Sequence, residues 1–162
     1  MTRNQLLGSL LAGFAITAIA LTSDAAGGNK SDSKVKAVAT ASKIDAGGNQ
    51  TVTITLAIDK GWHIYANPVN HKQEFLNPAK TRITSIKAKS EISDVAVKYP
   101  PGTPYIDKDT KDMYDIYAGT VKIEAKLKRA SGDASPIDIV IDVQACSGDV
   151  CLMPGKVSVK AQ

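Results

Sequence analysis

Residues 145–160 read Ala-Cys-Ser-Gly-Asp-Val-Cys-Leu-Met-Pro-Gly-Lys-Val-Ser-Val-Lys and contain the only two cysteines of the chain. Apolar and polar residues alternate before this stretch, from Ile137 to Ala145, and a shorter alternating run follows the proline. A period of two is typical of a half-buried β-strand. The stretch therefore predicts a strand, a tight turn and a second strand, with Cys146 and Cys151 at the two shoulders of the turn.

The same alternation marks other strands upstream of the cysteines. It is strongest over Thr120–Lys128, where Val, Ile, Ala and Leu alternate with lysine and glutamate, and it is also clear over Thr51–Ile58. Further strand candidates are Val35–Ile44, Trp62–Ala66, Arg82–Lys89 and Val95–Tyr99. Seven or eight short strands with turn signals and no helical period predict an all-β fold, an immunoglobulin-like antiparallel β-sandwich.

The alternation also assigns side chains to faces. Cys146 falls on the parity opposite to the inward row of the preceding strand, so we expect it on the polar face. In the short strand candidate after Gly61, His63 and Tyr65 share one face, and Trp62 and Ile64 share the other.

Two segments between the strands are predicted to be loops. Residues 67–80 are mostly polar, and we expect His71 within them to be solvated. Pro100, Pro101 and Pro104 lack the N–H group that a strand ladder needs, so they predict a long loop that runs to about Asp115. Long loops are often functional.

Composition excludes several classes of function. Of the 162 residues 43% are hydrophobic and 5% aromatic, and the net charge is +4. The lysines are spread along the strands instead of clustered, which indicates a solvated outer face and no nucleic-acid partner. The chain carries no hydrolase, nucleotide-binding or zinc-protease motif, so we expect no small-molecule cofactor.

The N-terminus is typical of an exported protein. Residues 1–25 combine a positively charged start, an apolar run and small residues, which predicts a signal peptide, with an uncleaved N-terminal anchor as the alternative. Residues 26–34 are small and polar and predict a flexible linker before a domain at 35–162. Either arrangement predicts a periplasmic or secreted domain, where disulfides persist.

The cysteine pair allows three uses. A structural disulfide is the commonest one in exported proteins, but a loop this short would gain only about 2 kcal/mol from the chain entropy of the unfolded state. A reachable disulfide across a tight turn would instead suit redox exchange. Metal binding is the third use, with sulfur and imidazole ligands drawn from Cys146, Cys151, His63, His71, Met113 and Met153. The spacing of the two cysteines is a poor metal signal, so we expect no metal, and we expect Met153 to pack beside the turn.

Three motifs carry a family resemblance: Gly-Trp-His-Ile-Tyr at 61–65, Ile-Tyr-Ala-Gly at 116–119, and residues 144–154 with both cysteines followed by Leu-Met-Pro. Together they resemble the N-terminal periplasmic domain of the thiol:disulfide interchange protein DsbD. The resemblance covers about residues 35–162. It implies an immunoglobulin-like fold and a redox-active disulfide with thiol:disulfide interchange or protein-disulfide reductase activity. Its partners would be thioredoxin-like periplasmic proteins or a membrane electron donor.

The resemblance also implies roles for individual residues. Cys151 would be the attacking cysteine and Cys146 the resolving one. Residues 111–114 match a cap loop that shields the pair, with Met113 as the shield between Asp112 and Tyr114, at a position where family members often carry phenylalanine. His63 and Tyr65 match positions that line the site, and a histidine beside a thiolate could lower its pKa. A surface histidine is the alternative for His63.

The sequence shows no membrane helices or thioredoxin-like domain after the cysteine pair, so we expect a separately encoded electron donor. The prediction is a monomeric domain for periplasmic thiol–disulfide exchange. The alternative is a noncatalytic β-sandwich binding module with a structural disulfide.

Overall fold

The computed structural model describes residues 30–72 and 74–162, so the expected signal segment at 1–25 lies outside the described residues. The described chain forms eleven strands and two short 3₁₀ helices. In chain order these are η1 (Ser31–Lys34), β1 (Val35–Ala41), β2 (Asn49–Ile58), β3 (His63–Tyr65), η2 (Glu74–Ala79), β4 (Arg82–Lys87), β5 (Ile92–Lys98), β6 (Thr103–Ile106), β7 (Met113–Ala118), β8 (Thr120–Arg129), β9 (Ile137–Val143), β10 (Ala145–Cys146) and β11 (Gly155–Ala161). None of the described helices is long and apolar enough to cross a membrane.

Two antiparallel sheets form the sandwich, one in the order β1-β2-β8-β5 and the other in the order β11-β9-β4. Their inward rows share one hydrophobic core, in which Ile54, Ile123 and Ile141 are completely buried. In β8 every second residue is buried and the lysines and glutamate between them are exposed. The apolar residues that alternate in the sequence are thus the ones buried against the facing sheet. The predicted immunoglobulin-like antiparallel β-sandwich is confirmed.

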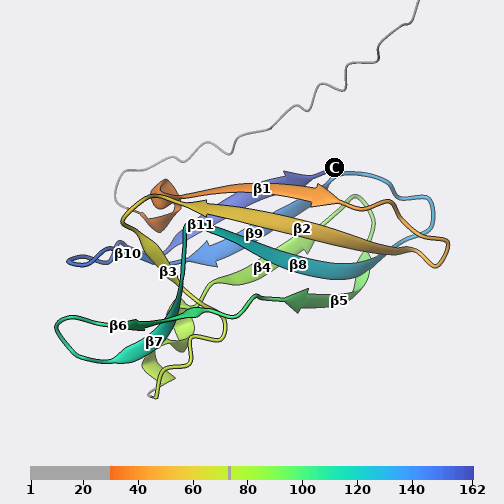
Figure 1. The fold of residues 1–162 in the computed structure, drawn as a ribbon. Coiled ribbons are helices and arrows are strands. Elements are labelled where there is room, and N and C mark those ends of the chain that lie inside the picture. The colour runs from red at the N-terminus through yellow and green to blue at the C-terminus, as the bar shows by residue number, and fades with distance from the viewer. Residues whose placement is uncertain (1–29, 73) are drawn as a thin grey trace, which may run out of the picture.

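A third sheet, in the order β10-β3-β7-β6, continues the sandwich at one end. β7 leads directly into β8 through Gly119, whose φ of 65° lies in the left-handed region that glycine adopts without strain. Figure 1 shows β10 and the β6–β7 hairpin at the same end of the molecule, while the turn between β8 and β9 lies at the opposite end. This third sheet places the cysteines against the hairpin.

The prediction of a long loop up to Asp115 is wrong. Thr103–Ile106 and Met113–Ala118 pair in register as a β-hairpin, with Tyr105 opposite Tyr114. Pro104 is tolerated because β6 is the edge strand of its sheet, where the missing N–H breaks no ladder.

Two other expectations about irregular segments also need correction. The polar segment at 67–80 contains η2, and His71 is not solvated, because only 3% of its side chain is exposed. The final part of the expected linker, Ser31–Lys34, is the helix η1, and Ser31 is completely buried. The folded domain therefore includes residues before Val35.

Candidate functional site

The two cysteines form a disulfide across a four-residue turn. The sulfur atoms are 2.01 Å apart and the Cα atoms 4.0 Å apart. The two residues face each other as an antiparallel bridge, and two backbone hydrogen bonds flank them: Ser147 N–H donates to Val150 O at 2.8 Å, and Leu152 N–H donates to Ala145 O at 2.9 Å. The predicted strand–turn–strand arrangement, with a cysteine at each shoulder, is what the structure contains.

The two sulfur-bearing residues differ sharply in exposure. Cys151 is exposed, whereas Cys146 is only 1% exposed. The expectation that Cys146 lies on a polar face is therefore wrong. Its parity is as predicted, opposite to the inward row of β9, but the third sheet covers that face here. Cys146 packs in a second, small apolar cluster with Tyr65, Val69, Tyr114 and Ile116.

Tyr65 brings a hydroxyl group to the disulfide. Its oxygen lies 3.6 Å from Cys146 Sγ and 3.9 Å from Cys151 Sγ. Sulfur in a disulfide carries no proton, so the tyrosine O–H is the donor. Burial raises the pKa of Tyr65, which keeps the hydroxyl protonated and able to donate.

His63 lies directly opposite Cys146, because the two residues are register partners between β3 and β10. Its side chain is buried, its ring centroid is 4.7 Å from that of Tyr105, and its Nε2 has no hydrogen-bond partner among the described residues. The surface alternative for His63 is therefore wrong. Burial lowers its pKa, and the Asp107 carboxylate opposes this effect. The neutral ring is favoured, which weakens its capacity to stabilise a thiolate by charge.

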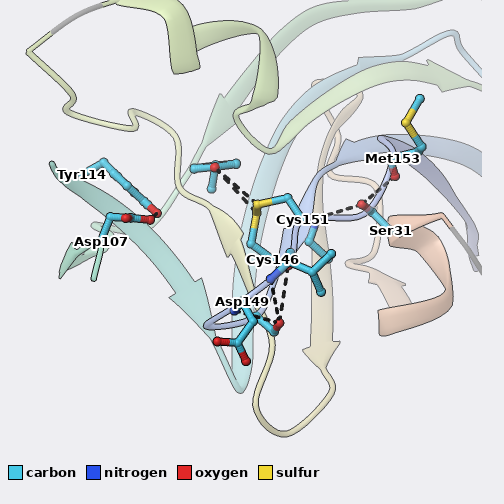
Figure 2. The surroundings of a disulfide bond; sticks show 11 residues. Ser31, Asp107, Tyr114, Cys146, Asp149, Cys151 and Met153 are labelled. Carbon is cyan, nitrogen blue, oxygen red and sulfur yellow. Dashed lines mark hydrogen bonds between the residues drawn. A yellow bond between two sulfur atoms is a disulfide. The ribbon is translucent and has the colours of Figure 1, made fainter. Parts of the chain in front are cut away.

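The β6–β7 hairpin lies over the cysteine turn. Tyr114 is 6% exposed, its ring centroid is 5.3 Å from that of Tyr65, and its hydroxyl donates to Asp107 Oδ2 at 3.4 Å. Figure 2 shows Tyr114 and Asp107 together on one side of the disulfide. A Cβ atom at Gly148, in the cysteine turn, would lie 3.5 Å from Lys108 Nζ at the hairpin tip. The Lys108 side chain of the hairpin tip therefore lies next to the cysteine turn.

Two other residues of the expected cap loop lie differently from Tyr114. Met113 is 56% exposed on β7. Asp112 is 46% exposed at its side chain, and its Oδ2 lies 3.9 Å from Nε2 of His71. The His71 ring in turn stacks edge-on against Phe75 with a centroid distance of 4.8 Å. Asp112 and His71 therefore link the hairpin to the segment around η2.

Ser31 was not expected at the site. Its hydroxyl donates to the carbonyl of Met153 and accepts the N–H of Ala145, both at 2.8 Å. No periodic pattern surrounds Ser31 in the sequence, so nothing local indicates its burial. Met153 was expected to pack beside the turn, but it is 69% exposed, and only its backbone is held.

The described residues contain no group of three or more His, Cys, Asp or Glu side chains that could hold a metal ion. One exposed and one buried cysteine are paired across a turn beside a hairpin. The fold and the site therefore define a class: an immunoglobulin-like domain with a solvent-accessible disulfide at one end.

Comparison with known families agrees with this class. The model for the N-terminal domain of the thiol:disulfide interchange protein DsbD matches residues 33–162, and the chain belongs to this family. No curated protein sequence matches the chain.

Solved structures of the same fold include the N-terminal periplasmic domain of ScsB from Proteus mirabilis, with 19% identity and a TM-score of 0.56. That match covers 78% of this chain and 45% of the ScsB structure, so the chain spans less than half of it. The reduced DsbD N-terminal domain of Neisseria meningitidis is also similar, with 16% identity, a TM-score of 0.42, and coverage of 75% of this chain and 82% of that one.

Proposed function

We propose that this domain carries out thiol–disulfide exchange in the periplasm through Cys146 and Cys151, passing reducing equivalents to thioredoxin-like proteins. The observation that carries the proposal is the unequal exposure of the two cysteines, with Cys151 exposed and Cys146 1% exposed. Exchange requires one sulfur that an incoming partner can reach and a second that stays behind to resolve the mixed disulfide.

In the reduced domain, the Cys151 thiolate attacks a disulfide of the acceptor. The acceptor S–S bond breaks, a Cys151–acceptor disulfide forms, and one acceptor sulfur leaves as a thiolate. Cys146 then attacks the sulfur of Cys151, the mixed disulfide breaks, and the second acceptor sulfur leaves. The acceptor gains two electrons, the pair returns to the disulfide form, and the protons of the two cysteine thiols end on the two acceptor thiols.

Tyr65 supports this sequence at the buried sulfur. When the disulfide of the domain is reduced again, the thiolate of the electron donor attacks the sulfur of Cys151. Cys146 then becomes the leaving thiolate in an apolar cluster. A buried anion without a hydrogen bond is costly. The Tyr65 hydroxyl, 3.6 Å from Cys146 Sγ, is placed to donate to that thiolate.

The surface around the pair suits a protein partner. In the β6–β7 hairpin and in residues 147–153, four large apolar side chains are more than half exposed: Ile106 (62%), Met113 (56%), Val150 (53%) and Met153 (69%). Exposed apolar groups around a reactive centre are typical of a docking surface. We assign this rim to contact with a thioredoxin-like protein.

The test uses a purified thioredoxin-like protein in its disulfide form, mixed with two single-cysteine variants of the domain. Cys146→Ser should form a mixed disulfide through Cys151 that is detected on a nonreducing gel after rapid alkylation, because the domain lacks its resolving thiol and alkylation blocks the acceptor thiol that would reverse the reaction. Cys151→Ser should form little, since its remaining sulfur is buried. Equal trapping by the two variants would contradict the assigned roles. Trapping by neither would favour a noncatalytic module with a structural disulfide.

A further inference from the structure

The segment before β1 is fixed to both stems of the cysteine turn. Ser31 is completely buried, and its hydroxyl bridges the N–H of Ala145 and the carbonyl of Met153. Its own N–H also donates to Met153 O at 2.9 Å. These partners lie 114 and 122 residues away in sequence. Figure 2 shows Ser31 beside the turn, on the side away from Tyr114.

The packing around Ser31 leaves little freedom for this contact. Lys30 forms a parallel bridge with Met153. A Cβ atom at Gly155 would lie 2.5 Å from the backbone nitrogen of Asp32, so the segment sits against the backbone at a position where only glycine fits. Lys30 before Ser31 and Asp32 after it both lie against the chain around Met153 and Gly155. The Ser31 hydroxyl between them therefore has a fixed position.

The two stems that Ser31 joins are the two sides of the disulfide. Ala145 directly precedes Cys146, and Met153 follows Cys151 by two residues. The bridge is made in the oxidised state, in which the sulfur atoms are bonded and the Cα atoms are 4.0 Å apart. Reduction breaks this bond, and the sulfur atoms must then move apart to nonbonded contact. A clamp across the stems opposes that separation.

We propose that Ser31 is a positioning residue for the cysteine pair, which holds the stems of the turn together and shifts the dithiol–disulfide equilibrium toward the disulfide. Preorganisation of this kind raises the effective concentration of one thiol toward the other. It makes the reduced domain a stronger electron donor. The inference deepens the proposed function and rests on it.

The test is the equilibrium between the domain and a glutathione or dithiothreitol buffer, measured for the wild type and for Ser31→Ala. The variant should favour the dithiol form by about three- to tenfold, which corresponds to a potential less negative by about 15 to 30 mV for a two-electron couple. Ser33→Ala is the matched control. It removes a hydroxyl from the same short helix, one that bonds only Lys30 O within the helix region. We expect its equilibrium constant to match the wild type. Ser31→Thr, which keeps the hydroxyl, should have an equilibrium constant between those of Ser31→Ala and the wild type.

Unfolding midpoints of the oxidised and reduced forms separate positioning from simple support. A merely structural role would lower both midpoints equally and leave the equilibrium constant of Ser31→Ala unchanged. That result, or a shift toward the disulfide, would overturn the proposal. The absolute wild-type potential judges the proposed exchange function, whereas the difference between variants judges Ser31, so the two can fail independently.

Discussion

The Tyr65 hydroxyl is the group beside the disulfide that can donate a hydrogen bond to a cysteine thiolate. Its hydroxyl is within 3.9 Å of both sulfurs, while Cys146 itself is almost inaccessible to water. Reduction by a small thiol generates a thiolate at Cys146, in a cluster that otherwise consists of apolar and aromatic groups. We therefore expect the proposed exchange reaction to depend on the Tyr65 hydroxyl at the step that forms the Cys146 thiolate.

Tyr65→Phe should slow the reduction of the disulfide by dithiothreitol. A hydrogen bond to a charged group contributes about 1.5–3 kcal/mol, so the rate should fall roughly tenfold or more. Stopped-flow measurement of dithiol formation gives the rate. Tyr99→Phe is the control, because that hydroxyl accepts the N–H of Ile83 and does not contact the disulfide. Equal rates for Tyr65→Phe and the wild type would remove Tyr65 from the chemistry.

Sequence parity predicted which residues share a face but not what covers that face. His63 and Tyr65 do lie toward the cysteines, and Cys146 does point away from the main core. Cys146 was expected on a polar face and a surface position was the alternative for His63, but both residues and Tyr65 are buried. The covering groups come from β6, from β7 and from the segment after β3, and no pattern local to residues 63, 65 or 146 predicts them.

The β6–β7 hairpin packs over the apolar cluster that contains Cys146. Its Tyr105 and Tyr114 are register partners, with ring centroids 5.4 Å apart, and they cover His63 and Tyr65 from one side. The two cap-loop candidates occupy opposite sides of β7, since Tyr114 is buried and Met113 is exposed. Substituting Tyr114 and Met113 one at a time therefore shows which of the two side chains shields the disulfide.

Tyr114→Ala should increase the rate at which small thiols attack the disulfide several-fold, because it removes the buried ring that covers the cluster with Cys146. Met113→Ala is the matched comparison on the neighbouring position, and we expect a smaller change. The rate of reaction with dithiothreitol, at a fixed pH, measures both. A larger effect for Met113→Ala would assign the shield to methionine, as the family resemblance implied.

Alternation predicted the long strands because burial in a sandwich repeats every two residues. It predicted β8 almost to the residue, since each apolar side chain there faces the core. It failed for β6, where prolines argued against any strand, although an edge position tolerates a missing N–H. It also failed for η1 and η2, which are held by contacts with distant residues and not by their own sequence.

At the scale of the whole molecule, the two ends of the sandwich have separate tasks. At the end opposite the cysteines, the buried Arg129 pairs with Asp133 at 3.2 Å and with Gln50 at 3.0 Å, which ties the β8–β9 turn to β2. At the other end lie the β6–β7 hairpin, β10 and the short helix before β1, as Figure 1 shows. The hydrophobic core of the sandwich lies between these two ends, and the proposed exchange chemistry belongs to the end with the cysteines.

The reduction potential of the Cys146–Cys151 pair decides whether this end of the domain carries an exchange-active disulfide. The measurement equilibrates the domain with glutathione or dithiothreitol buffers and quantifies the dithiol form by thiol alkylation. We predict a value between about −180 and −270 mV, the range of proteins that exchange disulfides. A value below about −300 mV is typical of structural disulfides and would rule out the proposed exchange function.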